Sequence, residues 1–175
     1  MLTQKELKRL FTYNPVTGVF TYNIGNKRKK KGDVLGSNSN GYLMCQIKGK
    51  GYKLHRLAWL YVNGVFPSQC IDHINHDKKD NRIDNLRDVS HKENLRNTKL
   101  RKGSVCHGVT YDKVLDVWNV QIDSVYDSSF ECYPDAVNRR KQLEKDNGYH
   151  KNHGNGQGYN HYDEVMEMYR QRGMK

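Results

Sequence analysis

An Asp-His pair followed by two spaced asparagines is the feature that most constrains this chain. These residues are Asp72, His73, Asn85 and Asn94. The pair and Asn85 each lie beside apolar residues, a polar stretch over 77–82 separates them, and a capping serine precedes Asn94. The segment therefore predicts a strand, a loop, a second strand and a helix. A carboxylate, an imidazole and two carboxamides in that order suit the hydrolysis of a phosphodiester bond with one divalent metal.

The side chains of this set suit different parts of the hydrolytic reaction. Phosphodiester hydrolysis needs an activated water, a cation against the transition-state charge, and stabilisation of the departing oxygen. His73 can act as the general base on water because the ordinary pKa of imidazole lies near neutral pH. Asp72 and Asn94 can each supply a hard oxygen, and two protein ligands leave an octahedral Mg²⁺ free to bind phosphate and water. The sequence thus predicts one Mg²⁺ or Mn²⁺ per site.

Residues 55–97 contain several short motifs around this set. They are His55-Arg56-Leu57-Ala58, Ile71-Asp72-His73, Asp80-Asn81-Arg82, Asp84-Asn85-Leu86-Arg87 and Glu93-Asn94. In these motifs the segment resembles the HNH endonucleases, especially those of phages and mobile introns. The resemblance implies a ββα-metal unit with Asp72 and Asn94 as metal ligands and His73 as the general base. It also implies that Asn85 braces the loop between the strands, and that cleavage leaves a 5′-phosphate.

Positive charge is concentrated in the first part of the chain. Residues 1–60 carry twelve Lys and Arg against two acidic side chains, whereas residues 105–175 carry nine against eleven. The overall net charge of +11 indicates a polyanionic partner, which we expect to be double-stranded DNA. The alternative for the run 27–31 is a solvated loop, and for Arg56 a solvated helix start. The predicted DNA contacts in this part are Lys27, Arg28, Lys29, Lys30, Lys31, Arg56 and Arg87.

The C-terminal part has a pattern of its own over 107–111, 118–122, 136–137 and 148–154. In these segments, residues 104–154 resemble the Apetala/ethylene-response type of DNA-binding domain. The resemblance implies a three-stranded sheet backed by one helix, with the sheet reading DNA in the major groove. The predicted third strand, over 123–131, is acidic where the family is basic, and it lacks a glycine turn. Base contacts are expected from Tyr111, Lys113 and Gln121.

We therefore expect an α+β fold with a ββα-metal (HNH) nuclease core, a basic β-rich N-terminal module and a small C-terminal module of three strands and one helix. The predicted boundaries are 1–66 for the leader, 67–102 for the nuclease core, 104–154 for the C-terminal module and 155–175 for a closing loop and short helix.

The predicted function is a metal-dependent DNA endonuclease, phage-encoded and of the homing or nicking type. Two alternatives stay open: a DNA-binding regulator with a non-catalytic HNH core, and a structure-selective or restriction-type nuclease. One site per chain favours a monomer that nicks. The four cysteines form no C-x-x-C pair and no apolar stretch is long enough to span a membrane, so we expect a cytoplasmic protein, in the host cytoplasm if phage-encoded.

Overall fold

The computed structural model describes residues 2–25, 28–98, 106–151 and 153–154. The chain divides into two compact units, Met1–Asn94 and Leu95–Lys175, and both mix helices with antiparallel strands. The expected α+β class is confirmed. Among the described residues, no helix is long and apolar enough to cross a bilayer. The predicted linker at 99–104 and the predicted helix at 162–170 lie outside the described residues.

The first unit contains three small antiparallel sheets, β1–β2, β3–β4–β5 and β6–β7. Its elements in chain order are α1 (Gln4–Leu10), β1 (Phe11–Asn14), β2 (Val19–Tyr22), β3 (Ser37–Ser39), β4 (Tyr42–Ile47), β5 (Lys50–Lys53), α2 (Leu54–Asn63), β6 (Cys70–His73), η1 (Ile83–Asn85), β7 (Leu86–Val89) and the start of α3 (His91–Leu95).

Local sequence signals set several of these boundaries. The Thr3 hydroxyl accepts a hydrogen bond from the Glu6 amide and so caps α1, and Gly64 ends α2 in the left-handed conformation. The β4–β5 hairpin turns at Lys48 and Gly49, whose φ angles are +51° and +76°. The loop needs only these two residues, because two positive φ angles match the twist of the paired strands.

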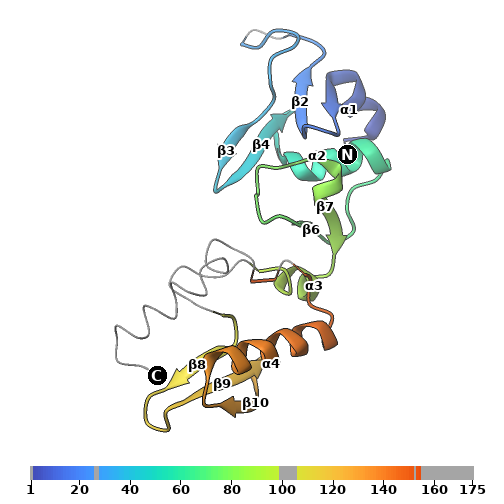
Figure 1. Ribbon diagram of the computed structural model, residues 1–175. Coiled ribbons are helices and arrows are strands. Elements are labelled where there is room, and N and C mark those ends of the chain that lie inside the picture. The colour runs from blue at the N-terminus through green and yellow to red at the C-terminus, as the bar shows by residue number, and fades with distance from the viewer. Residues whose placement is uncertain (1, 26–27, 99–105, 152, 155–175) are drawn as a thin grey trace. The chain divides into compact units, whose positions relative to one another are not determined.

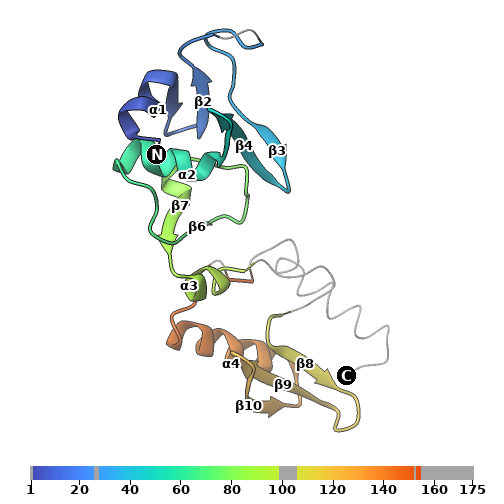
Figure 2. The ribbon, with the colours of Figure 1, turned by 180° about the vertical axis from the view of Figure 1, so that it is seen from behind.

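The core of the first unit is built around α2. This helix contacts α1, β4, β5 and η1, and both ribbon views show it near the middle of the unit (Figures 1 and 2). The predicted leader and most of the predicted nuclease core thus share one hydrophobic cluster. Its buried members are Leu2, Leu7, Phe11, Tyr13, Phe20, Leu35, Ile47, Leu54, Leu57, Ala58, Leu60 and Leu86.

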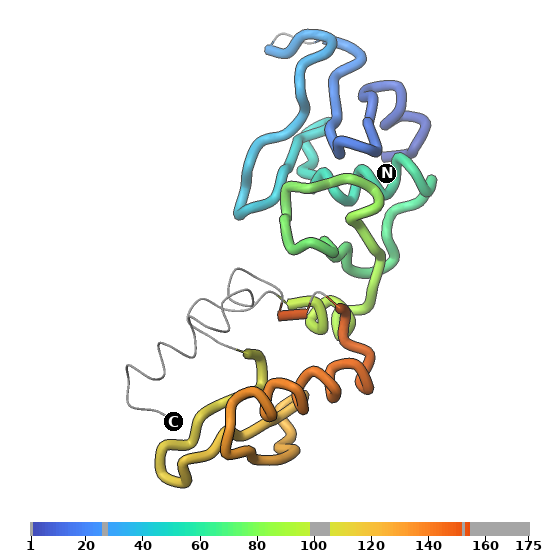
Figure 3. Tube along the Cα trace, in the orientation of Figure 1, coloured from blue at the N-terminus to red at the C-terminus, as the bar shows by residue number. Residues whose placement is uncertain are grey.

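The β1–β2 hairpin of the leader is fastened to the loop between β6 and η1, whose path can be followed in Figure 3. The Tyr13 hydroxyl donates to the Asn81 carbonyl over 2.7 Å, and burial raises the pKa of Tyr13 to about 12. Gly18 has a φ of +71°, and a Cβ placed there would lie 2.6 Å from the Arg82 nitrogen and from the Asn81 carbonyl carbon. The hairpin therefore approaches the loop so closely at position 18 that only glycine, which has no side chain, fits there.

Replacing Gly18 with alanine is expected to destabilise the first unit by about 2 kcal/mol or more, because it adds a backbone clash to the left-handed strain. The matched control is Gly49→Ala, since Gly49 has a φ of +76° but nothing within 4 Å of its Cβ position. Urea unfolding of the two variants measures the difference. Equal losses of stability would show that the close approach contributes nothing.

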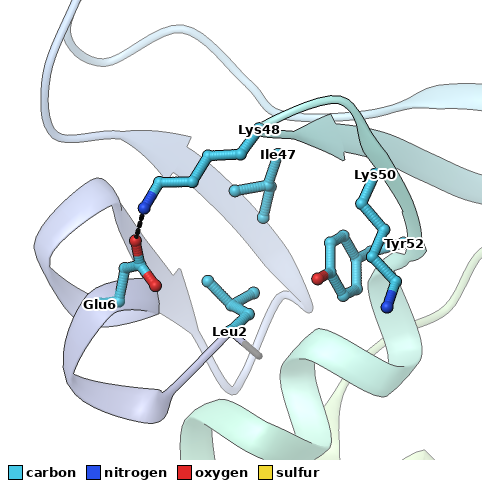
Figure 4. A pocket seen from close by; sticks show the side chains of 6 residues that line it. All are labelled: Leu2, Glu6, Ile47, Lys48, Lys50 and Tyr52. Atoms are coloured by element: carbon cyan, nitrogen blue, oxygen red, sulfur yellow. Dashed lines mark hydrogen bonds and ion pairs between the residues drawn. The ribbon is translucent and has the colours of Figure 1, made fainter.

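A pocket lies between α1 and the β4–β5 hairpin (Figure 4). The Lys48 ammonium pairs with the Glu6 carboxylate along its rim. The lining residues are Leu2, Glu6, Ile47, Lys48, Lys50 and Tyr52. None of them belongs to the predicted catalytic or metal-binding set, so the pocket adds nothing to the hydrolytic site.

The second unit is a three-stranded antiparallel sheet in the order β10–β9–β8 with α4 packed on one face (Figure 2). The elements are β8 (Val109–Asp112), β9 (Val117–Ile122), β10 (Val125–Phe130) and α4 (Tyr133–Asp146). The third strand forms without a glycine turn because Asp123 and Ser124 both adopt positive φ, +48° and +66°. The buried core between sheet and helix is Cys106, Val109, Trp118, Val120, Tyr133, Ala136 and Leu143.

Candidate active site

Asp72 and His73 end strand β6, which pairs with β7 in antiparallel register. Asp72 stands opposite Arg87, and His73 opposite Leu86. Both side chains are buried, each with 5% of its surface exposed. Two buried polar side chains at the end of a four-residue strand are unusual, because ionisable groups are rarely buried without partners. Their partners therefore decide what the site can do.

Arg87 is the partner of Asp72 across the two strands. Its Nε donates to Asp72 Oδ2 over 2.7 Å, and its Nη2 lies 2.6 Å from the same oxygen. The guanidinium side chain is 27% exposed, against 6% for the carboxylate. This contact orients the carboxylate, and it gives Arg87 a positioning role at the site. Its predicted contact with DNA stays a prediction.

His73 is held by Asn81 and by a second imidazole. Its Nε2 lies 3.4 Å from Asn81 Oδ1, and its ring meets that of His55 edge to face at 5.0 Å. Burial lowers the pKa of His73, and the contacts with Asn81 and with Asp72 oppose that shift. His73 is therefore neutral at neutral pH, which is the form that accepts a proton.

Asn85 fastens the loop that joins the two strands. Its side-chain oxygen accepts from the Asn75 amide over 3.0 Å, and its side-chain nitrogen donates to the Asp80 carbonyl over 2.9 Å. Its own carbonyl accepts from the Ile74 amide. These are the contacts expected of a residue that braces the loop. Asn85 itself ends a 3₁₀ turn and precedes β7, so the expected strand over 85–89 begins one residue later.

Asn94 lies on α3, which begins at a capping box. The Glu93 amide donates to Ser90 Oγ over 3.2 Å, and the Ser90 amide donates to Glu93 Oε2 over 2.9 Å. The Asn94 amide bonds to the Ser90 carbonyl, and the Asn94 side chain is half-buried. The helix is short and ends at Leu95, so Asn94 lies in its last turn.

Divalent metal binding can be tested against the oxygen donors present. A carboxylate and a carboxamide are hard ligands that suit Mg²⁺ or Mn²⁺. Within the described residues, no group of three or more His, Cys, Asp or Glu is arranged to hold a metal. Asp72 and Asn94 thus carry oxygen donors of the type that suits such a metal, and their assignment as its ligands stays a prediction.

Three residues at the site were not predicted from the sequence. His55 and Asn81 are 5% and 1% exposed, and Tyr42 of β4 contacts both histidines, at 5.3 Å from His55 and 6.1 Å from His73. His55 is buried rather than solvated at the start of α2, and burial lowers its pKa to about 3. His55 and Asn81 both belong to motifs described in the sequence analysis, which was the signal that the sequence offered, whereas Tyr42 belongs to none of them.

The predicted DNA contacts of the first unit fall into two groups. Lys27 lies outside the described residues, whereas Arg28, Lys29, Lys30 and Lys31 are exposed in the loop after β2. Arg56 contacts the main chain of the protein itself, and its predicted contact with DNA stays a prediction. Its two terminal nitrogens donate to the Gln69 and Pro67 carbonyls and so tie the end of the α2–β6 connection to the helix.

In the second unit, the three predicted base contacts do not share one face. Tyr111 packs on Trp118 at 5.0 Å, on the side of the sheet that α4 covers, and its hydroxyl donates to Asp116. Gln121 is exposed on the opposite face, and Lys113 is exposed in the β8–β9 turn. Gln121 is thus exposed on the sheet face opposite the helix, and all three base contacts stay predictions.

Comparison with known proteins gave one match. The family model for HNH endonuclease matches residues 52–96, which span β5 to α3 and include all four predicted site residues. Searches of curated proteins and of solved structures found no match. Residues 52–96 are therefore an HNH endonuclease domain, of the family that hydrolyses the phosphodiester bonds of DNA.

Proposed function

We propose that this chain is a divalent-metal-dependent DNA endonuclease of the homing or nicking type, with His73 as its general base. The observation that carries the proposal is the burial of His73 as a neutral imidazole beside Asp72, on a hairpin whose loop Asn85 braces. A phage origin and a single nick per visit belong to the same proposal.

The reaction assigns one proton transfer to His73. The imidazole accepts a proton from a water molecule, and the water oxygen forms a bond to phosphorus. The bond between phosphorus and the 3′ oxygen breaks, the 3′ oxygen takes a proton from solvent, and the product strand keeps a 5′-phosphate. Asn81 holds the imidazole in place, and Arg87 holds the Asp72 carboxylate. Positioning a base in this way contributes roughly 10²- to 10⁴-fold in rate.

The HNH family typically uses a divalent metal. Here Asp72 and Asn94 would hold it, and such an ion, when bound, neutralises charge on the phosphate and on the departing oxygen. The family match and the oxygen donors support this assignment. Mg²⁺ is the proposed ion and Mn²⁺ its substitute.

The proposal is tested by conversion of supercoiled plasmid with the purified full chain. We expect open-circle product in Mg²⁺ or Mn²⁺ and none in EDTA. Linear product without an open-circle intermediate would show that the enzyme cuts both strands in one event and does not nick a single strand. DNA binding without any metal-dependent cutting, on plasmid and on phage and host DNA, would overturn the proposal in favour of a binding-only protein.

The pH dependence of cleavage follows from the direction of the His73 shift. Burial lowers the pKa of His73 below its ordinary value of 6.5, and the neutral imidazole is the active form. We therefore expect kcat/KM to be constant at neutral pH and to fall on acidification with a midpoint below 6.5. Plasmid nicking rates at subsaturating DNA between pH 4.5 and 8 measure this. A midpoint above 6.5 would contradict the assignment of His73 as the base.

The second unit is proposed to read the DNA target with its exposed sheet face, as an Apetala/ethylene-response-like module. Thr110, Asn119 and Ser129 face one another across the three strands, and Gln121 faces Tyr126. These side chains are neutral hydrogen-bonding groups of the kind that read base edges. In the full chain, replacing Asn119 and Gln121 with alanine should relax the choice of nicking sites. Unchanged sites would overturn this role.

A further inference from the structure

Two lysines from different parts of the first unit converge on one tyrosine ring. Lys53 Nζ lies 4.2 Å from the centroid of Tyr42, and Lys78 Nζ lies 5.1 Å from it. Tyr42 begins β4, Lys53 ends β5, and Lys78 belongs to the loop between β6 and η1. The ring holds both ammonium groups through cation–π contact while leaving them exposed to water.

Neither ammonium group is paired with a carboxylate among the described residues, because no acidic side chain there lies within ion-pair distance of Lys53 or Lys78. Lys53 is also the N-cap of α2, and the first turn of that helix contains no acidic residue. A cation is unfavourable at a helix N-terminus, where the helix dipole already presents positive charge. Positive charge therefore accumulates where an anion would be stabilised.

A residue in contact with the same tyrosine ring carries a buried polar atom. His55 is the second residue of α2, its ring contacts Tyr42 at 5.3 Å, and its Nδ1 is buried with no hydrogen-bond partner in the described part of the chain. Burial keeps this imidazole neutral, so it adds no charge and retains one N–H to donate. An oxygen-bearing anion beside Tyr42 would be stabilised by the two ammonium groups, and the neutral His55 ring would add no opposing charge.

The cluster also adjoins the reacting imidazole. Tyr42 lies 6.1 Å from the ring of His73, and His55 contacts that ring at 5.0 Å. An anion bound at Lys53 and Lys78 would thus lie close to the phosphate under attack. On a nucleic acid, the anions next to a reacting phosphate are its neighbours along the backbone.

We propose that Lys53 and Lys78, held on Tyr42, bind the DNA backbone at phosphates neighbouring the one that is cleaved. The inference rests on the proposed nuclease function. Such contacts position the duplex against His73 and carry no sequence information. They differ from the basic loop 28–31 because they adjoin the reacting group and are fixed by an aromatic ring.

The test is the salt dependence of DNA binding by the full chain in EDTA, which allows binding and prevents cutting. Fluorescence anisotropy with a labelled duplex gives the affinity at several salt concentrations. Each phosphate contact contributes about −0.9 to the slope of log K against log salt. We expect Lys53→Met and Lys78→Met each to reduce the steepness by about 1, and the double variant by about 2. Lys53→Arg, which keeps the charge, should retain the slope.

Lys8→Met is the matched control. Lys8 lies 5.1 Å from the Tyr61 ring, so it makes an equivalent cation–π contact in α1. This variant should leave the slope unchanged, and melting curves establish that each variant is folded. A double Lys53/Lys78 variant with the wild-type slope, or a wild-type protein that does not bind the duplex at low salt, would overturn the proposal. The binding assay does not depend on cleavage. If the plasmid assay shows binding without cleavage, the nuclease mechanism is refuted, whereas the measured contribution of Lys53 and Lys78 to phosphate binding still holds.

Discussion

Replacement of His73 with alanine is expected to lower kcat/KM for DNA cleavage by roughly 10²- to 10⁴-fold, the usual contribution of a positioned general base. The reason is that the neutral ring of His73 is buried and is held 3.4 Å from Asn81 Oδ1. A water molecule in place of the ring would not be held in the same orientation. Initial rates of plasmid nicking at subsaturating DNA measure the ratio directly. Binding of DNA in EDTA should change little, because His73 contributes no net charge.

The control for this variant is another histidine close in sequence. His91 is exposed at the start of α3, and His91→Ala should cleave at nearly the wild-type rate. Equal losses in both variants would point to a general weakening of the fold. Full activity of His73→Ala would exclude His73 as the general base, and no base would then be assigned beside Asp72.

Replacement of Arg140 with methionine is expected to destabilise the second unit by about 3 to 5 kcal/mol, because it leaves a carboxylate buried without its main partner. Arg140 Nε donates to Glu144 Oε1 over 3.0 Å, and its Nη1 donates to the Gln121 carbonyl over 2.7 Å. The two side chains are only 4% and 8% exposed. Urea unfolding followed by Trp118 fluorescence measures the loss, in a background where Trp59→Phe removes the other tryptophan of the chain.

The adjacent residue provides the comparison. Arg139 lies on the same helix and pairs with Asp127 at 2.6 Å, but its side chain is 41% exposed. Water screens such a pair, so Arg139→Met should change the unfolding curve little. If both variants unfold alike, burial of the Arg140 pair does not determine the stability of this unit.

Signals confined to a few neighbouring residues predicted the fold well. Thr3 with Glu6, Ser90 with Glu93, and Gly64 mark helix ends in the sequence, and each has that role in the structure. The order of strand, loop, strand and helix around Asp72 and Asn94 could be predicted for the same reason. Short-range capping and turn chemistry depend on neighbours that the sequence displays directly.

Contacts between distant elements could not be predicted in this way. The pairing of Asp72 with Arg87 depends on the register of β6 against β7, and the burial of His55 depends on how α2 packs against β6. Neither register nor packing leaves a local signal in a single sequence. The turn at Asp123 and Ser124 is a different case, since two non-glycine residues occupy positions where glycine or asparagine is preferred.

The close contact of Gly18 with residues 81 and 82 bears on how such a nuclease can be recombined with other modules. A chimera joined near residue 66 would lack the β1–β2 hairpin that packs against the loop containing Asn81. It would also lack the Tyr13 hydroxyl that donates a hydrogen bond to the Asn81 carbonyl. The imidazole of His73 would then lose the support of its neighbour. We therefore expect the nuclease unit to be transferable only as a whole, from Met1 to beyond the end of α3, so that a different DNA-reading module would be joined after residue 96.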